Sequence, residues 1–90
     1  MNAIPFELKA YKKTPIFDQD SVPKGLLQNH NTKAGVWGKI CVLKGQLLYV
    51  IEKTGEETIL TPERCGIAEP QELHRIKPLG EVAFFVEFYK

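Results

Sequence analysis

Short apolar segments, interrupted by glycine or proline roughly every eight to twelve residues, limit what this 90-residue chain can fold into. The segments are rich in valine, isoleucine, leucine and phenylalanine, which favour strands. No long segment has helical periodicity, so the pattern predicts an all-β sandwich or barrel. The predicted strands are Phe6–Tyr11, Gly25–Asn29, Val36–Leu43, Gln46–Glu52, Glu56–Leu60, Cys65–Ala68, Leu73–Lys77 and Val82–Tyr89.

Two glycine-containing segments predict the turns between the strongest strands. Lys44-Gly45 predicts a tight hairpin, because glycine accepts the positive φ that such a turn requires. The segment 53–56 contains Gly55 and predicts a second hairpin.

The last predicted strand, Val82–Tyr89, is apolar on both faces apart from Glu87. A strand buried on both faces belongs inside a closed barrel or at a subunit interface. Residues 12–24 contain Pro15 and Pro23, and we expect them to form an extended or looping arm.

Composition excludes several classes of function. Twelve basic and eleven acidic residues give a net charge of +1 without a basic run, which argues against nucleic-acid binding. No segment approaches the roughly 20 apolar residues of a membrane-spanning helix, and no secretory signal is evident. These observations predict a cytoplasmic protein. A hydrophobic content of 43% in so short a chain predicts a buried interface, and therefore a homodimer.

The two cysteines, Cys41 and Cys65, have neither CxxC nor zinc-ribbon spacing, as expected for reduced thiols in the cytoplasm. Cys41 is interpreted as a small buried hydrophobic residue. Cys65 follows Arg64, whose charge favours a thiolate, so Cys65 is the better candidate for capturing a soft ligand.

The common enzyme motifs are missing from the sequence. It contains no G-x-S-x-G, P-loop or H-E-x-x-H motif, and no G-x-G-x-x-G fingerprint of a nucleotide or S-adenosylmethionine site. We therefore expect no nucleotide cofactor and no methyltransferase activity, and the sequence leaves open whether the chain is an enzyme at all.

His30 and His74, the two histidines, are the strongest candidates for a binding site. They lie far apart in the sequence, so only the fold could bring them together. Imidazole suits zinc, iron and nickel, and an open metal site typically uses three protein ligands. Glu72 is the predicted third ligand because it lies two positions before His74 on a predicted strand, with Glu87 and Gln71 as alternatives. Without a metal, protonated imidazoles could instead bind an oxyanion.

The residues predicted to contact a small ligand are Trp37, Lys39 and Gln71. Trp37 and Lys39 share one face of the strand Val36–Leu43, opposite to Ile40. In this hypothesis they form a pocket wall, where Lys39 attracts an anion. The alternative is that Trp37 packs in the core or at an interface.

Three segments also resemble a known family. The pattern His30-Asn-Thr-Lys-x-Gly-x-Trp-Gly-Lys, the segment 42–45 and the segment 69–71 with His74 resemble the cupin-like domains of tellurite-resistance TehB proteins and the small YeaR-type proteins. The resemblance covers about residues 11–89. It implies that residues 1–90 form one cupin domain, a double-stranded β-helix or jelly-roll barrel, associated with tellurite resistance and stress response. Compared with the metal-binding cupins, however, the chain departs from the pattern at two points. Thr32 stands where those proteins have a second histidine, and the cupin glutamate is missing.

The sequence therefore predicts a cupin-like barrel that binds a small ligand or a divalent metal ion beside His30 and His74. Two alternatives remain open, a metal-dependent enzyme acting on a small molecule and a dimerisation module without ligand chemistry.

Overall fold

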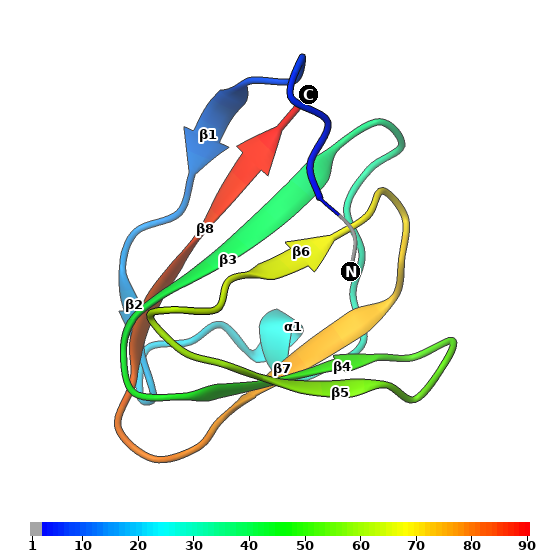
Figure 1. Cartoon of the computed structure of the whole chain (residues 1–90). Coiled ribbons are helices and arrows are strands. Elements are labelled where there is room, and N and C mark those ends of the chain that lie inside the picture. The colour runs from blue at the N-terminus through cyan, green and yellow to red at the C-terminus, as the bar shows by residue number, and fades with distance from the viewer. Residues whose placement is uncertain (1–2) are drawn as a thin grey trace.

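The computed structural model describes residues 3–90 and contains strands with a single short helix in that range (Figure 1). The all-β prediction is therefore confirmed. In chain order the elements are β1 (Ala10–Lys13), β2 (Phe17–Asp18), α1 (Lys24–Leu27), β3 (Trp37–Lys44), β4 (Leu47–Ile51), β5 (Glu57–Leu60), β6 (Gly66–Ala68), β7 (His74–Pro78) and β8 (Ala83–Tyr89).

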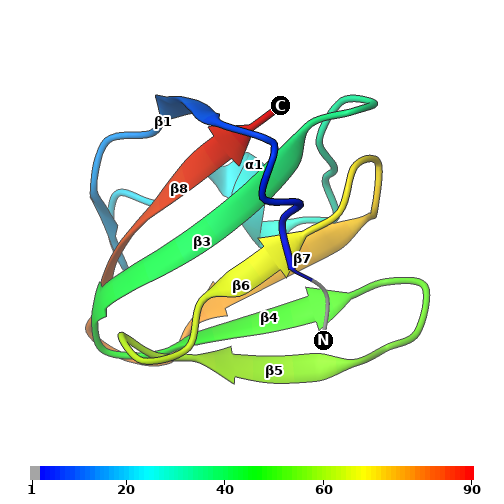
Figure 2. The same cartoon turned by 45° about the horizontal axis from the view of Figure 1, so that its top comes forward.

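The strands form two antiparallel sheets that face each other. The five-stranded sheet has the order β1-β8-β3-β6, with β2 pairing with the other end of β8. The three-stranded sheet has the order β5-β4-β7 and lies below the larger sheet in Figure 2. The strands thus make two separate sheets instead of one closed barrel, which corrects the expectation of closure.

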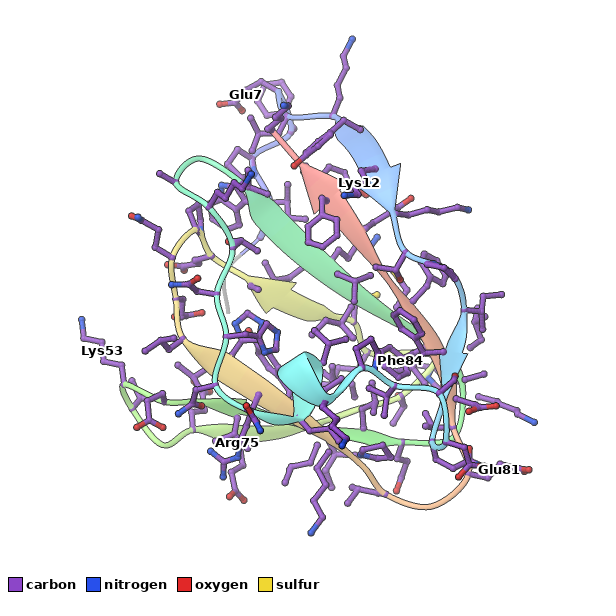
Figure 3. The ribbon with its side chains drawn as sticks, turned by 180° about the vertical axis from the view of Figure 1, so that it is seen from behind. Glu7, Lys12, Lys53, Arg75, Glu81 and Phe84 are labelled. Carbon is purple, nitrogen blue, oxygen red and sulfur yellow. The ribbon has the colours of Figure 1, made fainter. Side chains whose placement is uncertain are left out.

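The core fills the space between the two sheets. Alternate side chains of β3 and β8 point inward and meet the inward side chains of β4, β5 and β7. Figure 3 shows Phe84 between the sheets, whereas Lys53 and Glu81 point away from them. The buried cluster is Ile40, Val42, Leu47, Tyr49, Leu60, Ile76, Val82, Phe84 and Val86. Helix α1 lies against β7, and its Leu26 packs on this cluster.

Two of the predicted strands were wrong. The segment Gly25–Asn29 contains most of α1, since a short apolar run fits one helical turn as well as a strand. In the segment Phe6–Tyr11, a turn closes where Leu8 N–H donates to the Pro5 carbonyl, and strand β1 begins only at Ala10. The remaining six predicted strands match β3 to β8 closely.

The turn at Lys44-Gly45 was predicted correctly as a turn and wrongly as a hairpin. Gly45 has a φ of 81°, as expected, but β3 and β4 belong to different sheets. The turn therefore carries the chain from one sheet to the other. The second predicted hairpin is confirmed, because β4 pairs with β5 around Gly55, whose φ is 71°.

Residues 12–24 run along the edge of the larger sheet, where β1 and β2 both pair with β8. Strand β8 is consequently an inner strand of its sheet. Its Phe84 and Val86 are buried, whereas Phe85 is only half-buried on the outer face, with Lys13 Nζ 5.4 Å from its ring centroid. The prediction that β8 is buried on both faces is thus met only on the inner face. No helix among residues 3–90 is long and apolar enough to cross a membrane.

Candidate functional site

The fold brings His30 and His74 into direct contact. The two residues form an antiparallel bridge in which each backbone N–H donates to the other residue's carbonyl at 2.9 Å. Directly opposed residues of an antiparallel pair project their side chains to the same side. The imidazole centroids are accordingly 4.2 Å apart, in an edge-to-face arrangement of 67°.

Hydrogen bonds to the backbone determine which ring nitrogen of each histidine carries the proton. The Nδ1 atom of His30 is 2.9 Å from the Gln28 carbonyl oxygen, and that of His74 is 2.8 Å from the Glu72 carbonyl oxygen. A carbonyl oxygen only accepts hydrogen bonds, so each Nδ1 is the donor and each neutral ring keeps its lone pair on Nε2. Neither Nε2 has a hydrogen-bond partner among residues 3–90.

His74 is held neutral by its surroundings. It is 3% exposed, and burial is the main cause that lowers its pKa to about 4, with the nearby His30 adding to the effect. The Tyr49 ring lies 5.4 Å from the His74 ring, and its hydroxyl donates to the Ile67 carbonyl at 3.2 Å. Burial raises the pKa of Tyr49, so this tyrosine also stays neutral.

Both histidines line a cavity of about 220 Å³ between the two sheets. Every fully buried side-chain nitrogen or oxygen among the described residues has a hydrogen-bond partner. The Nε2 of His74 has none, so this atom is not fully buried, and the space that His74 lines is this cavity. Most of the wall is apolar, which is typical of small-molecule sites. The lining residues are Thr14, Leu26, His30, Asn31, Thr32, Gly38, Ile40, Ala68, His74, Ile76, Val86 and Phe88.

The two threonines of the wall are occupied in holding the backbone. The Thr14 hydroxyl donates to the Pro15 carbonyl at 2.9 Å and accepts from the Val86 N–H at 3.0 Å. The Thr32 hydroxyl donates to the Val36 carbonyl at 2.7 Å. The threonine hydroxyls are thus already engaged, whereas each neutral histidine keeps a free acceptor at its Nε2.

The predicted third ligands do not face the histidine cavity. Glu72 lies in the segment before β7 and lines a different cavity, together with Tyr49 and Glu56. Burial and the nearby Glu69 raise the pKa of Glu72. Glu87 lies on the outer face of β8, where it accepts a hydrogen bond from the Tyr89 hydroxyl at 2.9 Å.

Gln71 is exposed and has a φ of 62°. It is linked to the site through its backbone, because its N–H donates to the Thr32 carbonyl at 3.2 Å. Among residues 3–90, no three histidine, cysteine, aspartate or glutamate side chains are grouped so that they could hold a metal ion.

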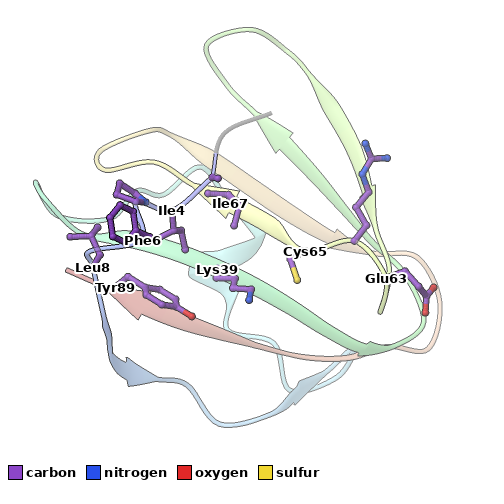
Figure 4. A pocket seen from close by; sticks show the side chains of 11 residues that line it. Ile4, Phe6, Leu8, Lys39, Glu63, Cys65, Ile67 and Tyr89 are labelled. Carbon is purple, nitrogen blue, oxygen red and sulfur yellow. The ribbon is translucent and has the colours of Figure 1, made fainter.

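Trp37 and Lys39 share the outer face of β3, as the alternation predicted, and Ile40 points to the core. Lys39 lines a wide cleft on the outside of the larger sheet, together with Ile67 and Tyr89 (Figure 4). The structure thus places Lys39 on the opposite side of the sheet from the histidine cavity.

Sequence reasoning missed three polar residues near the histidines: Thr14, Asn31 and Tyr49. Asn31 is adjacent to His30 and Tyr49 alternates with core residues on β4, so both had a weak local signal. Thr14 lies in the arm and had none.

Comparisons with known proteins agree on one family. Residues 12–86 match the TehB-like domain family. Two curated proteins from strains of Haemophilus influenzae, each described as probable S-adenosyl-L-methionine-dependent methyltransferase TehB, are 41% and 40% identical over 80 residues. Each match covers 83% of this chain but 28% of the relative, so the chain spans less than a third of these proteins.

Two solved structures have the same fold. The crystal structure of TehB from Haemophilus influenzae has a TM-score of 0.84 at 38% identity, over 93% of this chain and 32% of that one. A protein from Escherichia coli K12 has a TM-score of 0.92 at 19% identity, over 100% of this chain and 97% of that one. At that identity, the second likeness concerns the fold alone.

Proposed function

This chain belongs to the TehB-like domain family, and from that premise we propose that it is a small-ligand-binding domain whose site is the cavity beside His30 and His74. The observation that carries the proposal is the pair of free Nε2 acceptors next to a largely apolar space. Neither nitrogen is used within the described part of the fold, although the Nδ1 of each ring is held by a backbone carbonyl.

The ligand's chemistry follows from these acceptors. With His74 neutral at pH 7, its Nε2 accepts a hydrogen bond and repels a bare anion. The proposed ligand therefore carries a hydroxyl or N–H group on a compact apolar body. A cavity of about 220 Å³ is somewhat larger than the roughly 150 Å³ engineered cavity that binds benzene in another protein, which limits the ligand to a small molecule.

Phenol and anisole test this proposal, because they share the aromatic ring and differ in the hydroxyl donor. Each is titrated into ¹⁵N-labelled protein while amide shifts of cavity residues such as Ile40 and Ile76 are followed. We expect phenol to bind at least about tenfold more tightly than anisole, the equivalent of one hydrogen bond. We expect the double variant His30→Leu/His74→Leu, which has no acceptor in either side chain and is checked for folding by circular dichroism, to lose this preference. Equal binding of the two probes would refute the acceptor role, and binding of neither would refute the site.

A divalent metal ion is the second candidate occupant. A histidine that binds a metal through one ring nitrogen usually donates the N–H of its other ring nitrogen to a carbonyl, a carboxylate or water. Both histidines have this arrangement, with Nδ1–H bonded to a carbonyl and Nε2 free. The two imidazoles would supply two ligands, and water or a bound molecule would have to complete the coordination, since Glu72 lines another cavity. Calorimetric titration with Zn²⁺ tests this. Binding that disappears in His30→Gln/His74→Gln would support the metal, and absence of heat in the unchanged protein would exclude it.

Two finer features complete the proposal. We propose that the facing sheets are an open version of the jelly-roll arrangement that the cupin resemblance implies. We also propose that the domain contributes to tellurite resistance through the histidine cavity. Growth on tellurite of cells that produce either the unchanged protein or the double histidine variant checks the latter. Equal protection by both would refute it.

A further inference from the structure

Cys41 and Cys65 lie opposite each other on the outer face of the larger sheet. The register of the antiparallel pair β3 and β6 sets Lys39 opposite Ile67 and Ile40 opposite Gly66. Cys65 directly precedes β6, so one further step beyond the last pair of this register leads to Cys41 and Cys65. The two side chains are in contact, since a hydrogen bond with Cys65 is among the causes that raise the pKa of Cys41. Figure 4 shows the Cys65 side chain pointing toward β3 from the position just before β6. Both cysteines are free thiols.

The register gives the two cysteines a separation that suits a disulfide. Directly opposed residues of antiparallel strands have Cα atoms about 4.5 or 5.5 Å apart, and disulfides typically join Cα atoms about 4.4–6.8 Å apart. The thiols also influence each other, since burial raises the pKa of Cys41 to about 11 and the nearby Cys65 adds to this rise.

The two thiols differ in their access to solvent. Cys65 is exposed and lies in the open cleft that is also lined by Lys39 and Arg64. Cys41 is half-buried, and its raised pKa keeps it protonated at neutral pH. Because the thiolate is the nucleophile, an oxidant reaches and reacts with Cys65 first.

We propose that Cys41 and Cys65 form an oxidative modification site at which a hydroperoxide converts the two thiols into an intramolecular disulfide joining β3 to β6. The Cys65 thiolate attacks the peroxide, the O–O bond breaks, and the leaving oxygen takes up a proton. The resulting Cys65 sulfenic acid is attacked by the Cys41 sulfur. The S–O bond then breaks, and hydroxide leaves as water with the Cys41 proton. With hydrogen peroxide, two thiols lose two electrons and two protons, and the peroxide becomes two waters.

Hydrogen peroxide followed by alkylation and mass spectrometry tests this site directly. We expect the treated protein to lose two hydrogen atoms, to resist alkylation at both cysteines, and to yield a peptide pair joined through Cys41 and Cys65. Dithiothreitol should restore both thiols. Two alkylatable thiols after treatment, or a link between two chains through Cys65 alone, would overturn the proposal.

The single variants test the order of the steps. In Cys41→Ser, the sulfenic acid on Cys65 cannot be resolved and should be trapped by dimedone. In Cys65→Ser, Cys41 should remain a thiol that alkylates in the denatured protein. Dimedone labelling of Cys41 instead of Cys65 would overturn the proposed order. The peptide map of the unchanged protein locates the bond without either variant, so a folding defect in one variant leaves the test intact.

Discussion

Replacing His74 with glutamine should make the stability of this domain less dependent on pH. His74 is buried at 3% exposure, and burial lowers its pKa from 6.5 to about 4. The folded protein therefore keeps the imidazole neutral at pH values at which the unfolded chain has already bound a proton. Glutamine has a similar length and a carbonyl acceptor but does not titrate, so the variant isolates this effect.

The size and sign of the effect follow from the difference between the two pKa values. Between pH 6.5 and about pH 4 the unfolded state binds more protons than the folded state, so the free energy of unfolding falls as the pH decreases. The contribution of His74 is fully present above pH 6.5. At about 1.4 kcal/mol per pKa unit, its loss on acidification amounts to about 3 kcal/mol.

Urea unfolding of both proteins at several pH values between 4 and 7 measures the difference. The carboxylates titrate in both proteins and cancel in the comparison. We expect the free energy of unfolding of the unchanged protein to fall by about 3 kcal/mol more than that of His74→Gln. His30→Gln is the matched control, because it removes the smaller cause of the lowered pKa and keeps the burial of His74. It should retain most of the effect. Parallel curves for the unchanged protein and His74→Gln would refute a neutral buried imidazole.

Three further substitutions test the packing and the outer face of β8. Gly66→Ala should lower the free energy of unfolding in urea by about 1–3 kcal/mol, because a Cβ there would lie 2.7 Å from Leu60 Cδ1 in the core. Gly25→Ala is the control, since open space surrounds that position, and it should cause no loss. Phe84→Ala should cost about 3–5 kcal/mol by leaving a cavity between the sheets, and a loss below about 1 kcal/mol would contradict the described core. We further propose that the chain forms a homodimer through the outer face of β8. Phe85→Glu should then shift the dimer to monomer in sedimentation velocity. An unchanged sedimentation coefficient would exclude this face as the dimer interface.

The pattern of apolar residues was enough to predict β3 to β8, because inward and outward side chains alternate along most of them. Val82–Tyr89 was placed almost to the residue. The sequence could not assign β3 and β4 to different sheets, since Gly45 provides the same positive φ for a hairpin and for a crossing turn. It also could not distinguish one helical turn from a strand at Leu26, where tertiary packing decides.

The histidine pair was identified from the sequence, but the surroundings of the pair were not. Glu72 was expected to share a face with His74 through the two-residue periodicity of a strand. That periodicity does not apply, because β7 begins only at His74 and Gln71 before it adopts a φ of 62°. Glu72 contacts His74 through its backbone carbonyl, and the cavity that Glu72 lines is a different one. No side-chain pattern predicts a contact made by a backbone carbonyl.

Long-range ¹H–¹⁵N NMR of the imidazole rings at pH 7 tests the central claim most directly, because it reports which nitrogen of each neutral ring carries the proton. We predict the Nδ1–H tautomer for His74, with an unprotonated Nε2 whose resonance moves when phenol is added and not when anisole is added. We predict that neutral His30 has the same tautomer. An Nε2–H tautomer at His74, or a charged imidazolium there at pH 7, would contradict the account.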